Sequence, residues 1–148
     1  MMLATLIVGG PNVTVSVAQH SFQLPKKTSV ARFSKAEHVL AFINDYRDDK
    51  NPYVVPEAVA AMVRLGILND PEKSGIYTGF LAGVVQENQV DAERLISNMF
   101  PLPPTQQVVL IKAIVYSDLP NWKELLERFV ERMPARKALI DRYLFGDG

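Results

Sequence analysis

Proline and polar turn residues divide the chain at nearly regular intervals from residue 56 onward. The intervals are fourteen to seventeen residues, and the joints are at Pro56, Pro71, Asn88, Pro104, Pro120 and Pro134. An interval of that length accommodates a helix of about three turns and a short connection, whereas strands are usually about 5–6 residues long. Proline also fits the first turn of a helix, where its missing N–H costs nothing. The spacing therefore predicts consecutive helices whose sequence neighbours run antiparallel.

The apolar residues between the joints recur at helical spacing. The segment 34–49 opens with Ser34 and Glu37, three residues apart as in a capping box. The segment 120–133 carries one apolar stripe, formed by Trp122, Leu125, Leu126, Phe129 and Met133. On its other side, charged pairs four residues apart favour a helix: Lys123 with Glu127, and Glu124 with Arg128. Both segments are predicted to be amphipathic helices.

Two segments, 71–87 and 104–117, are apolar on nearly all sides, which is typical of helices inside a structure. The second is rich in β-branched residues, so 105–117 would also suit a buried strand. Its start at Pro104 and its length favour a helix. We therefore expect these two helices at the centre, with the first and last helices, 34–49 and 134–146, at the ends.

Glycine recurs every four residues in the third predicted helix, at Gly75, Gly79 and Gly83. Each glycine costs about 1 kcal/mol of helix propensity relative to alanine. Close contact with a neighbouring backbone usually offsets such a cost, so we expect a tight helix crossing here. The alternative is a small-residue face that binds a second copy, as membrane helices do. The apolar run is, however, too short to span a bilayer.

These patterns predict an all-α fold for residues 34–148: an antiparallel helical-pair array or an irregular bundle of about seven helices. Two consecutive helices form a unit of about 31 residues, within the range of helical-pair repeats, although the residues themselves do not repeat. A chain of 148 residues without cysteine is long enough to bury a core without disulfides. An extended N-terminal arm is expected to precede this single domain.

The arm has two parts, and the first carries no charge. Residues 1–18 end in Ser16-Val17-Ala18, small residues that suit cleavage of an export signal, but the basic start is missing and Gly9-Gly10-Pro11 interrupts the apolar run. Alternation at Val13, Val15 and Val17 fits a β-arm instead. Export to the periplasm and a cytoplasmic location both stay open. No uninterrupted run reaches the roughly 18 apolar residues of a membrane span.

The second part, residues 19–33, is predicted to be an extended basic linker. It contains Lys26, Lys27 and Arg32, with Lys35 just beyond. These few charges would bind a nucleic acid weakly, and the sixteen basic and sixteen acidic residues of the whole chain cancel. We therefore expect no nucleic-acid partner.

Residues that support catalysis or metal binding are sparse. The histidines are His20 and His38, and the one helical pairing, His38 with Asp45, has only Ala41 and Phe42 between its members where a third ligand would stand. Three serines lack a neighbouring base: Ser74, Ser97 and Ser117. The acidic residues lie at helix starts or on charged faces, where they need no catalytic role. The sequence therefore predicts no catalytic residue, no metal site and no cofactor.

The function that fits this chain best is a non-enzymatic helical interaction module that binds a protein partner or another copy of itself. The alternative is a small-ligand-binding protein or an enzyme with a pocket between helices near Tyr77, Phe80 and Tyr116. Polar groups converging on an enclosed pocket would favour the alternative, whereas an exposed apolar surface would favour the module.

Overall fold

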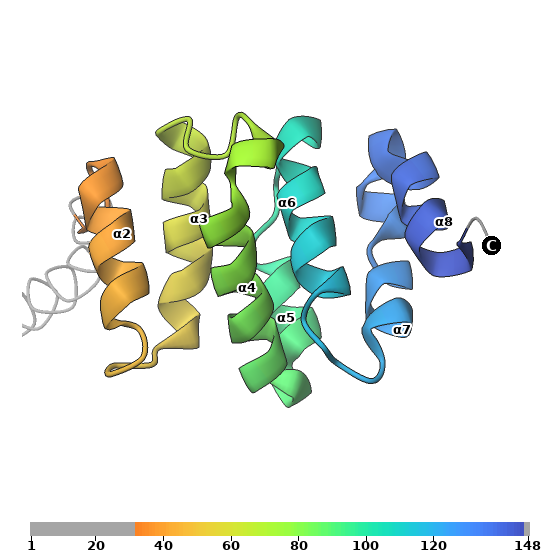
Figure 1. The fold of residues 1–148 in the computed structure, drawn as a ribbon, viewed down its shortest axis with the longest axis horizontal. Helices are drawn as coiled ribbons and strands as arrows, with labels where there is room; N and C mark the ends of the chain where they lie inside the picture. The colour runs from red at the N-terminus through yellow and green to blue at the C-terminus, as the bar shows by residue number, and fades with distance from the viewer. Residues whose placement is uncertain (1–31, 147–148) are drawn as a thin grey trace, which may run out of the picture. The chain divides into compact units, whose positions relative to one another are not determined.

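The computed structural model describes residues 32–146 of the chain. The predicted signal or β-arm at 1–18 and most of the predicted linker at 19–33 lie outside this range. The chain divides into two units, Met1–Ser34 and Lys35–Gly148, and the fold described below is that of the second. Between residues 32 and 146 there are seven α-helices and no strand (Figure 1). The predicted all-α fold is confirmed.

The α-helices are short and are joined by 3₁₀ turns. The seven helices are α2 (Ala36–Asp45), α3 (Val55–Arg64), α4 (Gly75–Glu87), α5 (Ala92–Ser97), α6 (Pro104–Val115), α7 (Trp122–Glu127) and α8 (Lys137–Phe145). The 3₁₀ turns are η1 (Pro52–Val54), η2 (Pro71–Lys73), η3 (Gln89–Asp91), η4 (Val130–Arg132) and η5 (Pro134–Arg136). Four of these turns lead into α3, α4, α5 and α8, at or near the predicted joints.

Several predicted helix starts need correction. Asp70 does act as a cap, since its side chain accepts from the Glu72 amide at 3.1 Å, but it caps the turn η2, and α4 starts only at Gly75. The cap of α2 is Lys35 rather than Ser34, and the Lys35 side chain makes no capping bond. Pro71 and Pro134 thus mark joints but occupy a 3₁₀ turn ahead of the helix, whereas Pro56 and Pro104 lie in the first turn of α3 and α6, as predicted.

The predicted amphipathic helix 120–133 is interrupted. It forms α7, which ends at Glu127, and continues as the separate 3₁₀ turn η4. Arg128, which was expected to pair with Glu124 four residues earlier, instead bonds Glu93 of α5. Lys123 lies with its ammonium over the ring of Trp122, 5.6 Å from the centroid.

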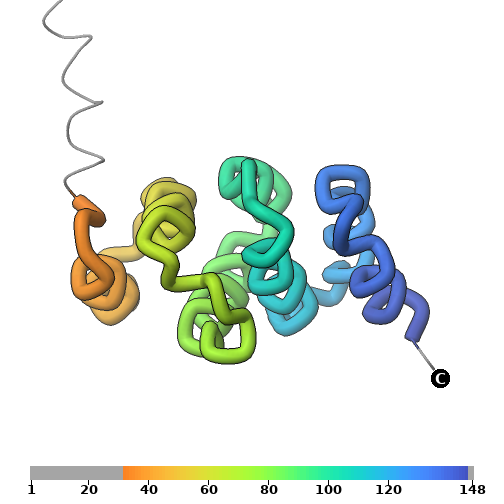
Figure 2. Tube along the Cα trace, turned by 90° about the horizontal axis from the view of Figure 1, so that it is seen from above, coloured from red at the N-terminus to blue at the C-terminus, as the bar shows by residue number. Residues whose placement is uncertain are grey.

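The centre of the helical unit is formed by α4 and α6, as the sequence predicted. These two helices pack against each other, and α2 and α8 lie beyond them at the two ends (Figure 1). Seen from above, α4, α6 and α8 lie in one row while α3 and α5 lie in another (Figure 2). The β-branched segment 105–117 is helical, and α6 buries the most residues of any helix: Gln106, Gln107, Val109, Leu110, Ile111, Ala113 and Ile114.

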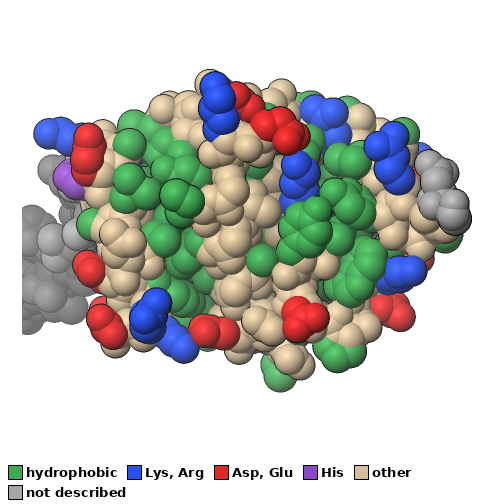
Figure 3. All heavy atoms as spheres, viewed as in Figure 1, with side chains coloured by type: hydrophobic (Ala, Val, Ile, Leu, Met, Phe, Trp, Pro, Cys, Tyr) green, Lys and Arg blue, Asp and Glu red, His purple; other side chains and the backbone are tan. Residues whose placement is uncertain are grey.

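The glycine row of α4 does not serve close packing. A Cβ added at Gly75, Gly79 or Gly83 would meet no atom within 4 Å. The buried side of α4 is formed by other residues: Thr78, Leu81, Ala82, Val84 and Val85. The glycines therefore lie along the outer side of the helix, and Figure 3 shows tan atoms there, between two areas of hydrophobic side chains. The expected tight crossing is wrong.

Candidate functional site

The side chains considered for metal or nucleophilic chemistry are either exposed or hydrogen-bonded within turns of the chain itself. His38 and Asp45 are both exposed on α2. Residues 32–146 contain no group of three histidine, cysteine, aspartate or glutamate side chains that could hold a metal ion. The buried hydroxyls of Ser74 and Ser117 donate to the carbonyl oxygens of Asp70 and Ile114, each at 2.7 Å. Both serines stabilise turns. His20 lies outside the described residues.

Phe80 and Tyr116, two of the three residues expected around an inter-helix pocket, contact different helices. Phe80 packs edge-on against Phe42 and Tyr46 of α2, with ring centroids 5.9 and 5.2 Å apart. Tyr116 follows α6 and is adjacent to Tyr143 of α8. Because these neighbours belong to opposite ends of the helical unit, Phe80 and Tyr116 do not form one pocket. Tyr77 is half-buried on α4.

An open groove of about 230 Å³ runs between α2 and α4. The bare backbone of Gly79 and Gly83 forms part of its wall, and Tyr46 and Phe80 contribute aromatic surface. An ion pair crosses the groove, with Nζ of Lys50, in the connection after α2, 3.1 Å from Oε1 of Glu87 on α4. The glycine row thus creates a shallow groove rather than a tight crossing.

Burial raises the pKa of Tyr46 above its usual 10.0, while the nearby Asn88 amide acts in the opposite direction. A tyrosine whose pKa is raised in the folded protein contributes stability at pH values below its pKa in the unfolded chain. This contribution is lost as the pH rises through the pKa of the folded protein. We expect Tyr46→Phe to lose less stability than the parent between about pH 8 and about pH 10.5. Urea denaturation at both values measures the difference. Equal alkaline losses in the two proteins would contradict the assignment to Tyr46.

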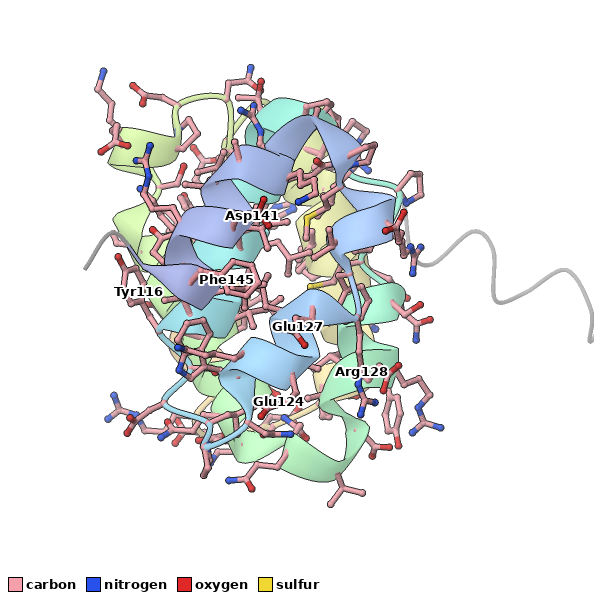
Figure 4. The ribbon with its side chains drawn as sticks, turned by 90° about the vertical axis from the view of Figure 1, so that its right-hand side faces the viewer. Tyr116, Glu124, Glu127, Arg128, Asp141 and Phe145 are labelled. Atoms are coloured by element: carbon pink, nitrogen blue, oxygen red, sulfur yellow. The ribbon has the colours of Figure 1, made fainter. Side chains whose placement is uncertain are left out.

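A group of aromatic side chains lies on α8 and at the end of α6: Tyr116, Tyr143 and Phe145, here called the aromatic patch. Tyr116 and Phe145 are 61% and 75% exposed. Figure 4 shows them on the same side of the molecule, and Figure 3 shows hydrophobic side chains gathered over α6 and toward α8. Tyr143 is half-buried, and its burial together with the Tyr116 hydroxyl raises its pKa.

A second open groove, of about 540 Å³, lies between α5 and the α7–η4 segment. We call it the arginine groove because Arg94, Arg128 and Arg132 line it. Arg128 Nη1 donates to Glu93 Oε2 across the groove. Arg94 Nη2 donates to Asp91 Oδ1 of the preceding turn at 2.9 Å. Two of the three guanidinium groups therefore have a carboxylate partner.

Arg132 is held without a carboxylate. Its Nη1 donates to the Ser97 hydroxyl at 2.7 Å, and its guanidinium lies over the ring of Phe100, 4.1 Å from the centroid. Phe100 in turn stacks on Phe129, with the ring planes 4° apart. Within residues 32–146, Arg132 has no acidic partner.

The arginine groove was missed from the sequence because its two walls are about 35 residues apart. The four-residue spacing of Arg128 and Arg132 was the available signal, but the local acids Glu124 and Glu127 gave these arginines apparent partners in their own helix. Only the tertiary structure, which places α5 opposite the segment that follows α7, brings Arg94 to the same groove.

No helix in the described part of the chain is both long and apolar enough to cross a membrane. No family model matches the chain, and no match was found among the curated proteins or the solved structures compared with it.

Proposed function

We propose that the protein is a non-enzymatic helical interaction module that binds a protein partner, or another copy of itself, through the aromatic patch. The observation that carries this proposal is the exposure of Tyr116 and Phe145 on the same side of the molecule, with Tyr143 next to Tyr116. Aromatic side chains are enriched at protein interfaces and often contribute most of the binding energy. Their burial by a partner removes a large apolar area from water.

The surroundings of the buried polar side chains also favour a module over an enzyme. The Thr78 hydroxyl donates to the Ser74 carbonyl at 3.0 Å, and the Gln107 amide donates to the Leu102 carbonyl at 2.8 Å. Gln106 donates to Asn69 Oδ1 at 2.9 Å. These groups stabilise turns and helix ends of the chain itself, rather than converging on an enclosed pocket as the groups of a small-ligand site do.

Site-specific photo-crosslinking tests the proposal. A benzoylphenylalanine at position 145 is expected to give adducts of discrete mass when cells of the native host are irradiated. The same probe at Asn44, an exposed position on α2, serves as the matched control and is expected to give none. An adduct of twice the protein's mass would identify a second copy as the partner. Absence of adducts at 145, or identical adducts at 44, would contradict the proposal.

A further inference from the structure

More positive than negative side chains line the arginine groove, and the chain's own acidic residues do not neutralise all of them. Three guanidinium groups line it, whereas Glu93 lines the groove and Asp91 lines the adjoining recess, so one guanidinium, that of Arg132, is left without a carboxylate partner within the described residues. The three guanidinium groups come from both walls, Arg94 from α5 and the other two from the α7–η4 segment. Guanidinium groups bind carboxylates through paired, charge-assisted hydrogen bonds, which favours an anionic ligand between these walls.

Arg132 is the best prepared of the three for a ligand. Stacking on Phe100 and the bond to Ser97 fix its guanidinium plane before any ligand arrives. A guanidinium that is already ordered loses less entropy on binding than a mobile side chain. Its remaining N–H groups stay available, because Ser97 is its one hydrogen-bond partner within the described residues.

A smaller recess of about 50 Å³ adjoins the groove. The two share Arg94 and Asn98, and the walls of the recess include Pro52, Pro56 and Leu95. The recess is therefore suited to a small apolar side chain. Val90 adds apolar surface at the groove, since it is fully exposed, while Phe129 lies buried beneath it.

We propose that the arginine groove binds an acidic peptide segment of a partner protein, with its carboxylates between the arginines and an adjacent apolar side chain in the recess. The apolar recess favours a peptide over a nucleic acid. The balanced charge of the whole chain favours it too, because nucleic-acid binding draws on a broad basic surface. This surface is separate from the aromatic patch, since none of the three patch residues lines the groove and Figure 4 shows Arg128 away from Tyr116.

Fluorescence anisotropy tests the proposal with the full chain and a labelled peptide of one leucine followed by a run of glutamates. The peptide is expected to bind, and its affinity is expected to fall as salt rises. Arg132→Gln is expected to weaken binding about tenfold, because one charge-assisted contact is lost. Arg142→Gln, an exposed position on α8 outside the groove, is the matched control and is expected to bind like the parent.

Two further variants separate binding from folding. Arg94→Gln removes a groove charge whose local partner is the exposed Asp91, so it reports on the groove even if Arg132→Gln lowers the melting temperature. Tyr53→Ser alters only the rim of the recess. It is expected to weaken the leucine-containing peptide several-fold and to leave a matched peptide without leucine unaffected.

Three results would overturn the proposal. The first is unchanged peptide affinity in both Arg132→Gln and Arg94→Gln. The second is equal binding of a peptide with lysine in place of glutamate. The third is competition by inorganic phosphate or a single-stranded oligonucleotide at the same charge concentration, which would make the groove a general anion site. None of these results bears on crosslinking at position 145, so the two proposals fail independently.

Discussion

Ile111→Ala is expected to destabilise the protein by about 3 kcal/mol, near the middle of the range for buried isoleucine truncations. Ile111 is 0% exposed on α6, the helix that contributes most to the core. The substitution removes buried methyl groups and leaves a cavity that the neighbouring helices cannot close. Urea denaturation followed by circular dichroism measures the loss in the free energy of unfolding.

Ile76→Ala is the matched control, because it removes the same atoms from a side chain that is 68% exposed on α4. Its expected effect is within about 0.5 kcal/mol of zero. If the two substitutions destabilised the protein equally, α6 would not be at the centre of the fold.

The double substitution Gly79→Ala with Gly83→Ala is expected to stabilise the protein by about 1–2 kcal/mol. Alanine gains up to about 1 kcal/mol over glycine within a helix, and neither added Cβ meets an atom within 4 Å. Thermal melts compare the double variant with the parent. A lower melting temperature would show that the glycine row is covered in solution, and it would support the dimer face considered from the sequence.

Gly66→Ala provides the opposite case. Gly66 has φ = +73°, a conformation that side-chain-bearing residues rarely adopt, and an added Cβ would lie 3.1 Å from Asn69 Nδ2. We expect this substitution to destabilise the protein by about 1–2 kcal/mol. The pair of experiments thus separates a glycine that the backbone requires from glycines that it does not.

The helices were predictable from the sequence because their signals are local. Proline spacing and apolar periodicity depend on residues within one or two turns, so α6 and the positions of the joints were identified. The detail at Pro71 was not, since an aspartate cap followed by proline suits a 3₁₀ turn as well as an α-helix. The start of α4 was consequently placed too early.

The grooves were not predictable because they depend on contacts between helices. Helix α4 is apolar on nearly every side, so periodicity does not indicate which side faces outward, and the glycine row was assigned to the wrong one. Arg128 had an acid available at Glu124, but the tertiary structure provides Glu93 instead. Neither the outward side of α4 nor the acidic partner of Arg128 can be predicted from a single sequence.

The short lengths of α5 and α7 affect both the arginine groove and the aromatic patch. Each helix has six residues, which is too short to be stable alone. Arg128, directly after α7, lines the arginine groove. Helix α7 also packs against α8, which carries Phe145 of the aromatic patch. If a ligand in the groove orders the segment that follows α7, we expect it to steady the support of the patch as well. Such a coupling between ligand binding at the two surfaces would act equally in both directions.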